Sequence, residues 1–164
     1  MIGKVIKYDI KDINTDLIIP ARYLTMIEPE YLAKHCMEDF DENFLQKKDE
    51  FGYTIVVAGS NFGCGSSREQ APIALKAAGV RCIIAPSFAR IFFRNAINIG
   101  LPIMECKKID ALKTGDNLEI SFTEGIIKNL TTGLELETRK TPFFLQEIIS
   151  VGGLINYAKQ KIIK

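Results

Sequence analysis

Three short apolar runs in the middle of this sequence limit the folds that it can adopt. They cover residues 54–58, 80–85 and 101–106 and show little polar alternation. A run of this length without alternation is typical of a strand buried on both faces, as in a parallel sheet. Helical patterns over about 68–78 and 88–99 separate the runs. This order predicts a parallel β-α-β-α-β unit with right-handed crossovers.

The ends of the two helical patterns carry residues with strong positional preferences. Gly79 follows the first pattern and Gly100 follows the second. Glycine is the residue that most often takes the left-handed conformation just after a helix. Ser87 precedes the second pattern and is predicted to cap its first turn with the side-chain hydroxyl.

The segments outside this unit carry weaker patterns. Residues 1–8 predict a strand and residues 12–16 an irregular turn, whereas 114–139 predict an antiparallel meander with turns at its glycines. The other predictions are a short helix over 29–37 with Pro29 in its first turn, an exposed charged segment over 40–50, and a helical tail over 142–163 broken at Gly152 and Gly153. Because no repeat or linker is visible, we expect residues 1–164 to form one α/β domain, a parallel β-α-β-α-β core with an antiparallel β addition.

Charge and hydropathy argue against two classes of partner. The net charge is +1, and basic and acidic residues are mixed along the chain, so no basic stripe indicates nucleic-acid binding. The apolar runs are far shorter than the roughly 18 residues that a membrane-spanning helix needs. Residues 1–6 lack the pattern of a signal peptide. We therefore expect a cytoplasmic protein that binds neither nucleic acid nor membrane.

The cysteines do not form a metal-binding pattern. Cys36, Cys64, Cys82 and Cys106 are widely separated and include no C-x-x-C pair. A zinc or iron–sulfur site built by this chain alone is therefore not expected. Cys82 and Cys106 lie inside apolar runs, which predicts small buried core residues.

Residues 59–70, called the glycine-rich loop below, carry the clearest functional pattern. The loop follows a buried strand and leads into a helix, the place where α/β sheets bind ligands. Gly59, Gly63 and Gly65 allow positive φ angles and close approach of backbone amides to an anion. The spacing matches neither of the glycine-rich nucleotide-binding motifs. A carboxylate or a phosphate group is the expected ligand.

Arg68 is the residue of this loop that a structural role explains least. An arginine at a helix start opposes the helix dipole, and its planar fork is suited to binding a carboxylate. The alternative is that Ser66 and Glu69 form a capping box for the following helix. In the next helical pattern Arg90, Arg94 and Asn98 share one face, and the two arginines have no acidic partner one turn away. This face is predicted to meet an anion or a partner surface, with a solvated helix face as the alternative. The apolar residues of this pattern, Ile91 among them, are expected to face the core.

Three segments resemble a known family. Residues 59–72, Gly-Ser-Asn-Phe-Gly-Cys-Gly-Ser-Ser-Arg-Glu-Gln-Ala-Pro, are similar to the signature of the aconitase swivelling domain. Residues 87–95 and 100–102 continue the resemblance at the expected distance. Residues 14–23 resemble the start of the separately encoded small subunits, and the chain length is similar to that of short isopropylmalate dehydratase small subunits.

The resemblance implies a swivelling β/β/α fold, a hydro-lyase activity and a two-part enzyme. It implies a large subunit, in a heterodimer or heterotetramer, that carries a 4Fe-4S cluster, with no cofactor bound by this chain. The implied reaction removes and re-adds water, converting 2-isopropylmalate into 3-isopropylmalate in leucine biosynthesis. By the same resemblance Ser66 is the catalytic base, and Ser67 and Arg68 contact a carboxylate of the dicarboxylate substrate.

The substrate is suggested by the segment after Pro20. Aconitases carry a further substrate-binding arginine near the start of this domain, and residues 1–16 contain none, which leaves Arg22 as a candidate. Leu24, Thr25 and Met26 lie in what resembles a specificity loop, where relatives that act on homoaconitate tend to carry an arginine. An apolar pocket there favours an isopropyl group, because burial of an unpaired third carboxylate would be costly. Homoaconitase, dimethylmalate and citraconate/methylmalate hydro-lyases remain the alternatives.

Two hypotheses of another class stay open. The chain could be a non-catalytic module that binds a carboxylate, or a structural partner subunit whose enzyme has its active site elsewhere. His35, the only histidine, is given no role.

Overall fold

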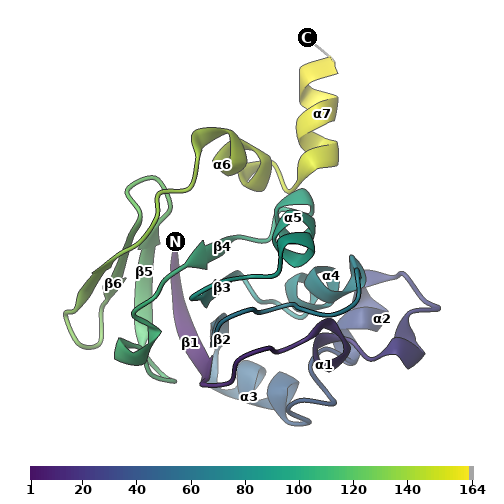
Figure 1. Ribbon diagram of the computed structural model, residues 1–164, viewed down its shortest axis with the longest axis horizontal. Helices are drawn as coiled ribbons and strands as arrows, with labels where there is room; N and C mark the ends of the chain where they lie inside the picture. Colours follow the sequence, from purple (N-terminus) through teal and green to yellow (C-terminus); the bar gives the residue numbers. More distant parts are fainter. Residues whose placement is uncertain (163–164) are drawn as a thin grey trace.

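The computed structural model describes residues 1–162 and is built on one mixed seven-stranded sheet (Figure 1). The order across the sheet is β4-β3-β2-β1-β5-β6-β7. The strand bounds are β1 Ile2–Tyr8, β2 Tyr53–Ala58, β3 Cys82–Ala85, β4 Ile103–Glu105, β5 Asn117–Ser121, β6 Ile126–Asn129 and β7 Glu135–Glu137. The first strand of the chain is therefore central and joins two halves of different type.

The parallel half confirms the predicted β-α-β-α-β unit. β1 pairs in parallel with β2, β2 with β3 and β3 with β4. Helix α4 (Gln70–Ala77) connects β2 to β3, and α5 (Arg90–Asn98) connects β3 to β4. Gly79 and Gly100 follow these helices with φ angles of +92° and +71°, so both predicted helix ends are confirmed.

The predicted cap of α5 is wrong. Ala89 is the N-cap residue and makes no side-chain cap. The hydroxyl of Ser87 instead accepts the backbone N–H of Asn61 at 2.9 Å, and the Ser87 carbonyl accepts the N–H of Phe62 at 3.1 Å. Ser87 therefore holds the glycine-rich loop rather than the helix.

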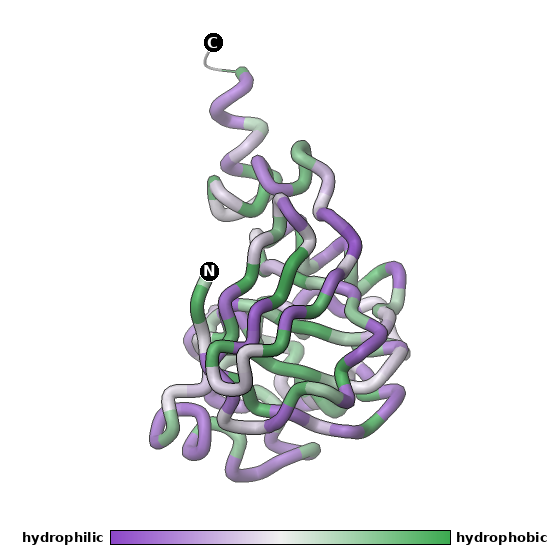
Figure 2. The backbone as a smooth tube through the Cα atoms, turned by 90° about the vertical axis from the view of Figure 1, so that its left-hand side faces the viewer, coloured by the Kyte–Doolittle hydropathy of each residue, from purple (hydrophilic) through white to green (hydrophobic). Residues whose placement is uncertain are grey.

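The antiparallel half confirms the predicted meander. β5 pairs with β1, β6 with β5, and β7 with β6, all antiparallel. Figure 2 views these strands from outside, with hydrophobic and hydrophilic residues alternating along them, and every second residue of β5 is buried. Such alternation is typical of strands with one face on a core and one in water.

Two hydrophobic cores lie on opposite faces of the parallel strands. In β3, Ile83 faces the core under the helices, whereas Ile84 faces a second core that includes Leu118 and Ile127 of the meander. The strands are therefore buried on both faces, which is why their sequences lack polar alternation. The helices, the parallel strands and the folded-over meander give the three layers of a β/β/α fold. Cys82 and Cys106 are buried in the second core, as predicted.

The other helices cover the first core or extend from it. They are α1 (Thr15–Ile18), α2 (Pro29–Lys34), α3 (Phe44–Phe51), α6 (Phe143–Ser150) and α7 (Leu154–Ile162), with short 3-10 turns at Ala21–Tyr23 and Ile109–Ala111. Pro29 begins α2, and the tail breaks at Gly152 and Gly153, as predicted within the described residues; residue 163 lies outside them. Figure 1 shows α7 projecting away from the body.

Three local expectations need correction. The turn predicted over 12–16 becomes helical at Thr15, because the Asn14 side chain accepts the N–H of Leu17 and caps α1. The 40–50 segment is not simply exposed, since Phe44 is buried in the first core. Ile91, expected toward the core, is half exposed. No helix within residues 1–162 has the length and apolarity to cross a bilayer.

Candidate functional site

The glycine-rich loop leaves β2 and runs between two other segments that hold it in place. On one side the N–H of Gly59 donates to Ile10 O at 3.0 Å and the N–H of Gly63 to Ile13 O at 2.8 Å. Further along, the N–H of Thr15 donates to Cys64 O at 2.8 Å. Ser87, as described above, holds the other side. The loop therefore has a fixed backbone path, which a preorganised site requires.

The three glycines have different physical roles. Gly63 has a φ of +76°, and a Cβ there would lie 2.2 Å from the ring of Phe92. A Cβ at Gly59 would lie 2.4 Å from Ile10 O, so this position needs glycine for close approach rather than for positive φ. Gly65 has a φ of +92° with no atom nearer than 3.5 Å to a Cβ. Of the three positions, only Gly65 has room for a Cβ, which would make ordinary van der Waals contacts.

Ser66 and Ser67 lie at the exposed end of this loop. Both residues are exposed, and the Ser66 carbonyl accepts the hydroxyl of Thr15 at 3.0 Å. In the part of the chain that the structure describes, the backbone N–H groups of residues 65–68 donate to no protein acceptor. Two hydroxyls and a row of free amides are thus presented on the surface, an arrangement that can bind an anion.

The capping-box alternative for Ser66 and Glu69 is wrong. Helix α4 begins at Gln70, four residues after Ser66. Its N-cap residue is Glu69, which makes no side-chain capping hydrogen bond. The conformation of residues 66–68 is therefore that of a loop, and their polar groups are not used to start the helix.

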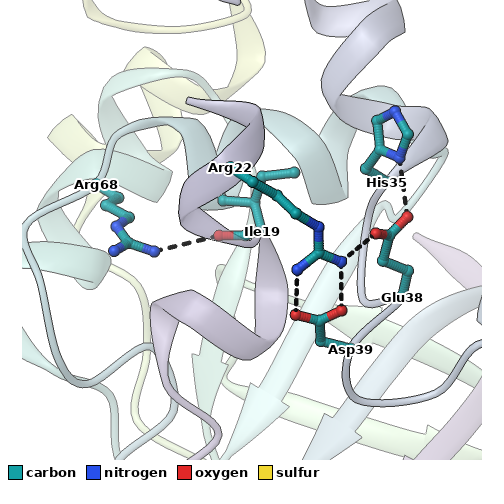
Figure 3. Close-up of polar contacts among 6 residues, drawn as sticks. All are labelled: Ile19, Arg22, His35, Glu38, Asp39 and Arg68. Carbon is teal, nitrogen blue, oxygen red and sulfur yellow. Dashed lines mark hydrogen bonds and ion pairs between the residues drawn. The ribbon is translucent and has the colours of Figure 1, made fainter. Parts of the chain in front are cut away.

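Arg68, the residue of this loop that a structural role explained least, has two protein partners. Its Nη1 donates to Asp16 Oδ1 at 2.5 Å and to the carbonyl of Ile19 at 3.3 Å, the latter drawn in Figure 3. The Arg68 side chain is 13% exposed and that of Asp16 is 52% exposed. Sequence reasoning did not assign Asp16 a role, although the residue lies in the Asn14-Thr15-Asp16 segment that carried the resemblance. Asp16 and the Ile19 carbonyl anchor the guanidinium at Nη1, while Nε and Nη2 keep their donors.

Arg22 lies on the other side of Ile19 and is paired with carboxylates of its own chain (Figure 3). It donates to both carboxylate oxygens of Asp39, at 2.8 and 2.5 Å, and to Glu38 at 2.5 Å. The hydrogen bonds from Arg22 hold the pKa of the Asp39 carboxyl below its ordinary value. The guanidinium is thus satisfied by two carboxylates of its own chain, which does not favour the predicted role of Arg22 as a substrate ligand.

The residues of the predicted specificity loop are partly or fully exposed. Leu24 is half-buried against the first core, whereas Thr25 and Met26 are exposed. His35 stacks on Tyr23 with ring centroids 3.7 Å apart and interacts with Glu38 at 2.8 Å. His35, given no role from sequence, therefore has a packing role beside this loop.

Arg90 and Arg94 line a separate cavity of about 450 Å³. It lies between α5 and the two C-terminal helices, and Phe88, Glu105 and Phe144 also line it. Within residues 1–162 neither arginine has an acidic group within 4 Å. The structure brings Ser66, Ser67 and Arg68 onto one loop, and Arg90 and Arg94 onto a different face.

Metal-ligating side chains do not gather in this region. Cys64, in the glycine-rich loop, is half-buried, and burial raises the pKa of its thiol. Among residues 1–162 there is no group of three or more His, Cys, Asp or Glu side chains placed to hold a metal ion.

Comparisons with known proteins agree on one family. The sequence model of the aconitase C-terminal domain matches residues 3–108. The chain is 55% identical to the 3-isopropylmalate dehydratase small subunit of Caldicellulosiruptor bescii, covering 99% of this chain and 96% of the relative, and 57% identical to that of Clostridium acetobutylicum, covering 96% of each. The crystal structure of 3-isopropylmalate dehydratase (leuD) from Methanocaldococcus jannaschii superposes with a TM-score of 0.90 at 44% identity, covering 99% of this chain and 96% of that chain. With this agreement over nearly its full length, the chain belongs to the aconitase C-terminal domain family, among the 3-isopropylmalate dehydratase small subunits.

Proposed function

We propose that this chain is the small subunit of a hydro-lyase that converts 2-isopropylmalate into 3-isopropylmalate in leucine biosynthesis, acting with a large subunit. The observation that carries the proposal is the glycine-rich loop, which presents Ser66, Ser67 and Arg68 together with free amides on a fixed backbone. Relatives named as the small subunit of this enzyme match over nearly the whole chain, which supports the same activity.

Ser66 is the residue that we propose removes the proton. A serine hydroxyl is a very weak acid, so its oxygen must be stabilised as an oxyanion before it can take a carbon-bound proton. The free N–H groups of residues 65–68 are suitable donors for that charge. After the proton transfer Ser66 is a neutral hydroxyl. In the hydration step it gives the proton to the carbon that lost the hydroxyl, while the hydroxyl adds to the carbon that gave up the proton.

Arg68 and Ser67 are proposed to hold a carboxylate of the substrate. Asp16 and the Ile19 carbonyl both accept from Nη1 of Arg68, so the other donors of the fork remain for a ligand. A substrate fixed in this way presents its labile hydrogen to Ser66 in one orientation, which lowers the entropic part of the barrier.

The large subunit is proposed to carry a 4Fe-4S cluster, as the family membership suggests. When bound there, such a cluster would supply Lewis-acid assistance to the loss of the hydroxyl group. We propose that the face formed by Arg90 and Arg94 contacts this partner. Exposed apolar side chains on the neighbouring C-terminal helices, among them Phe143, Phe144 and Ile155, support a protein surface as the occupant.

Leu24, Thr25 and Met26 are proposed to meet the isopropyl group. Their side chains provide no positive charge for a third carboxylate, which disfavours homoaconitate. Methylmalate and dimethylmalate differ from isopropylmalate only in apolar groups, so discrimination among them is expected to be about 10- to 200-fold. Turnover of 2-isopropylmalate, 2-methylmalate and homoaconitate by the assembled enzyme tests this order, and a preference for homoaconitate would contradict it.

The main experiment compares Ser66→Ala with Ser121→Ala in the assembled two-subunit enzyme. Ser121 is a half-buried serine at the end of β5 in the meander, away from the glycine-rich loop, and serves as the matched control. Loss of a general base typically lowers turnover by about 10²- to 10⁴-fold, while assembly should persist. Full activity of Ser66→Ala would contradict a catalytic role of this serine and would favour the alternative that the chain is a structural partner subunit. Binding of 2-isopropylmalate without turnover by the wild-type complex would favour the carboxylate-binding module.

A further inference from the structure

Residues 19–36 form an excursion that is closed at its base. The N–H of Met37 donates to the carbonyl of Ile18 at 2.8 Å, so the chain leaves and re-enters the body at one point. Met37 takes a φ of +64° to make this closure and is fully buried. The excursion carries Leu24, which packs against the first core, and the exposed residues Thr25 and Met26.

The base of the excursion is adjacent to Arg68. The guanidinium of Arg68 donates to the carbonyl of Ile19, the first residue after the closure (Figure 3). A change in how the excursion leaves the body would therefore move its outer residues relative to the proposed carboxylate ligand. A small angular change at the base produces a larger displacement at residues 24–26.

A two-pronged ion pair ties the excursion to the chain just beyond its base. Arg22, in the 3-10 turn before Leu24, makes two parallel hydrogen bonds to Asp39 and a third to Glu38. Two parallel bonds fix both the position and the plane of a guanidinium, whereas one bond leaves it free to rotate. Arg22 thereby sets the direction in which the following residues extend.

An aromatic stack supports the same turn from the other side. The ring of Tyr23 lies parallel to His35, with an interplanar angle of 10°, and Tyr31 packs edge-on against both rings. Nδ1 of His35 is 2.8 Å from Glu38, whose other oxygen binds Arg22. The Arg22 and Tyr23 anchors are joined through Glu38 into one cluster.

We infer that the Arg22–Asp39 pair is a positioning clamp that fixes residues 23–26 relative to Arg68 for selection of the substrate's alkyl group. Arg22 acts by positioning residues 23–26 and does not itself bind the substrate carboxylate. The inference rests on the proposed function, because it assigns a role to residues that contact substrate only in that reaction. Preordering of this segment lowers the entropic cost of binding a substrate against it.

The test is a double-mutant cycle of Arg22→Gln and Asp39→Asn in the assembled enzyme, with 2-isopropylmalate and 2-methylmalate as substrates. Each single variant should raise KM for 2-isopropylmalate about three- to fivefold, the range of a well-made surface ion pair, with kcat nearly unchanged. The preference for the isopropyl over the methyl substrate should fall. The double variant should be no worse than either single variant, because each removes the whole clamp.

Two further variants separate positioning from general stability. Arg22→Lys keeps the charge but cannot make two parallel bonds, so its KM should lie between the wild-type value and that of Arg22→Gln. Glu135→Gln removes an exposed partner of Lys128 in the meander and should leave KM unchanged. Thermal unfolding of all variants shows whether a KM change follows a loss of folding.

Several outcomes would overturn the clamp. If Arg22 bound the substrate directly, Arg22→Gln would lower kcat/KM far more than Asp39→Asn does. If the pair were only structural, the melting temperature would fall while KM and the isopropyl preference stayed constant. A wild-type complex that turned over neither substrate would instead reject the proposed function, so the two failures are distinguishable.

Discussion

A methyl group added at Gly63 tests how tightly the glycine-rich loop is held. Its φ of +76° lies in the left-handed region, which costs a residue with a Cβ roughly 1–2 kcal/mol. The new Cβ would also lie 2.2–2.5 Å from three atoms of Phe92. Phe92 is buried and packs edge-on against Phe62 at 5.2 Å, so it has little room to move. Overpacking of this kind adds roughly 1–3 kcal/mol, and we expect Gly63→Ala to lose about 2–5 kcal/mol of unfolding free energy.

Gly65→Ala is the matched control for this substitution. Gly65 also has a positive φ, +92°, but a Cβ there would meet nothing closer than 3.5 Å. Gly65→Ala should lose only the unfolding free energy that the positive φ costs, so the two variants should differ by the overpacking cost of roughly 1–3 kcal/mol. Equilibrium urea unfolding of the chain, followed by circular dichroism, measures both values. Equal losses in the two variants would refute the argument that Phe92 limits the space at Gly63.

Three other predictions follow from the same contacts. Asp16→Asn removes the charged partner of Arg68 and should lower kcat/KM roughly tenfold; an unchanged value would contradict the orienting role. Burial alone would raise the pKa of the Asp41 carboxyl, but its hydrogen bonds with the Lys47 ammonium hold that pKa below its ordinary value. Ionised Asp41 therefore makes its whole contribution to the unfolding free energy at pH values above the ordinary carboxyl pKa of about 4. That contribution is lost as the pH falls through the lowered pKa of the folded state. Asp41→Asn should flatten this acid limb in urea unfolding from pH 3 to 6. A thiol reagent should label Cys64 first in the native protein, faster as pH rises, because the other thiols are buried; simultaneous labelling of all four would count against the fold.

Most of the parallel half could be predicted because its determinants are local. A strand buried on both faces must be apolar at every position, and a helix that ends before a short connection favours glycine there. The central place of β1 could not be predicted in this way. β1 pairs with β2 about 50 residues later and with β5 more than 110 residues later, and nothing in its own sequence selects those partners.

Residues of the candidate site could be predicted where they lie together in one segment of the sequence. Pairs formed between residues that are distant in the sequence could not be predicted. The spacing of Gly63, Gly65 and Ser66 lies within a few residues and indicated an anion-binding loop. The pairing of Arg68 with Asp16 could not be predicted, because the two residues are 52 positions apart. Arg22 was a candidate substrate ligand, and its carboxylate partners could not be identified because they lie 16 and 17 positions away.

The exposure of the glycine-rich loop explains why a partner subunit is needed. Ser66 and Ser67 are open to water, where high dielectric screening makes the free amides of residues 65–68 weak stabilisers of an oxyanion. Excluding water would strengthen the same donors without moving them, because their backbone is already fixed by hydrogen bonds to residues 10–15 and to Ser87. In the proposed mechanism the residues of this chain supply the hydrogen-bond donors, and the large subunit, by covering the loop, supplies the low-dielectric surroundings that make them effective.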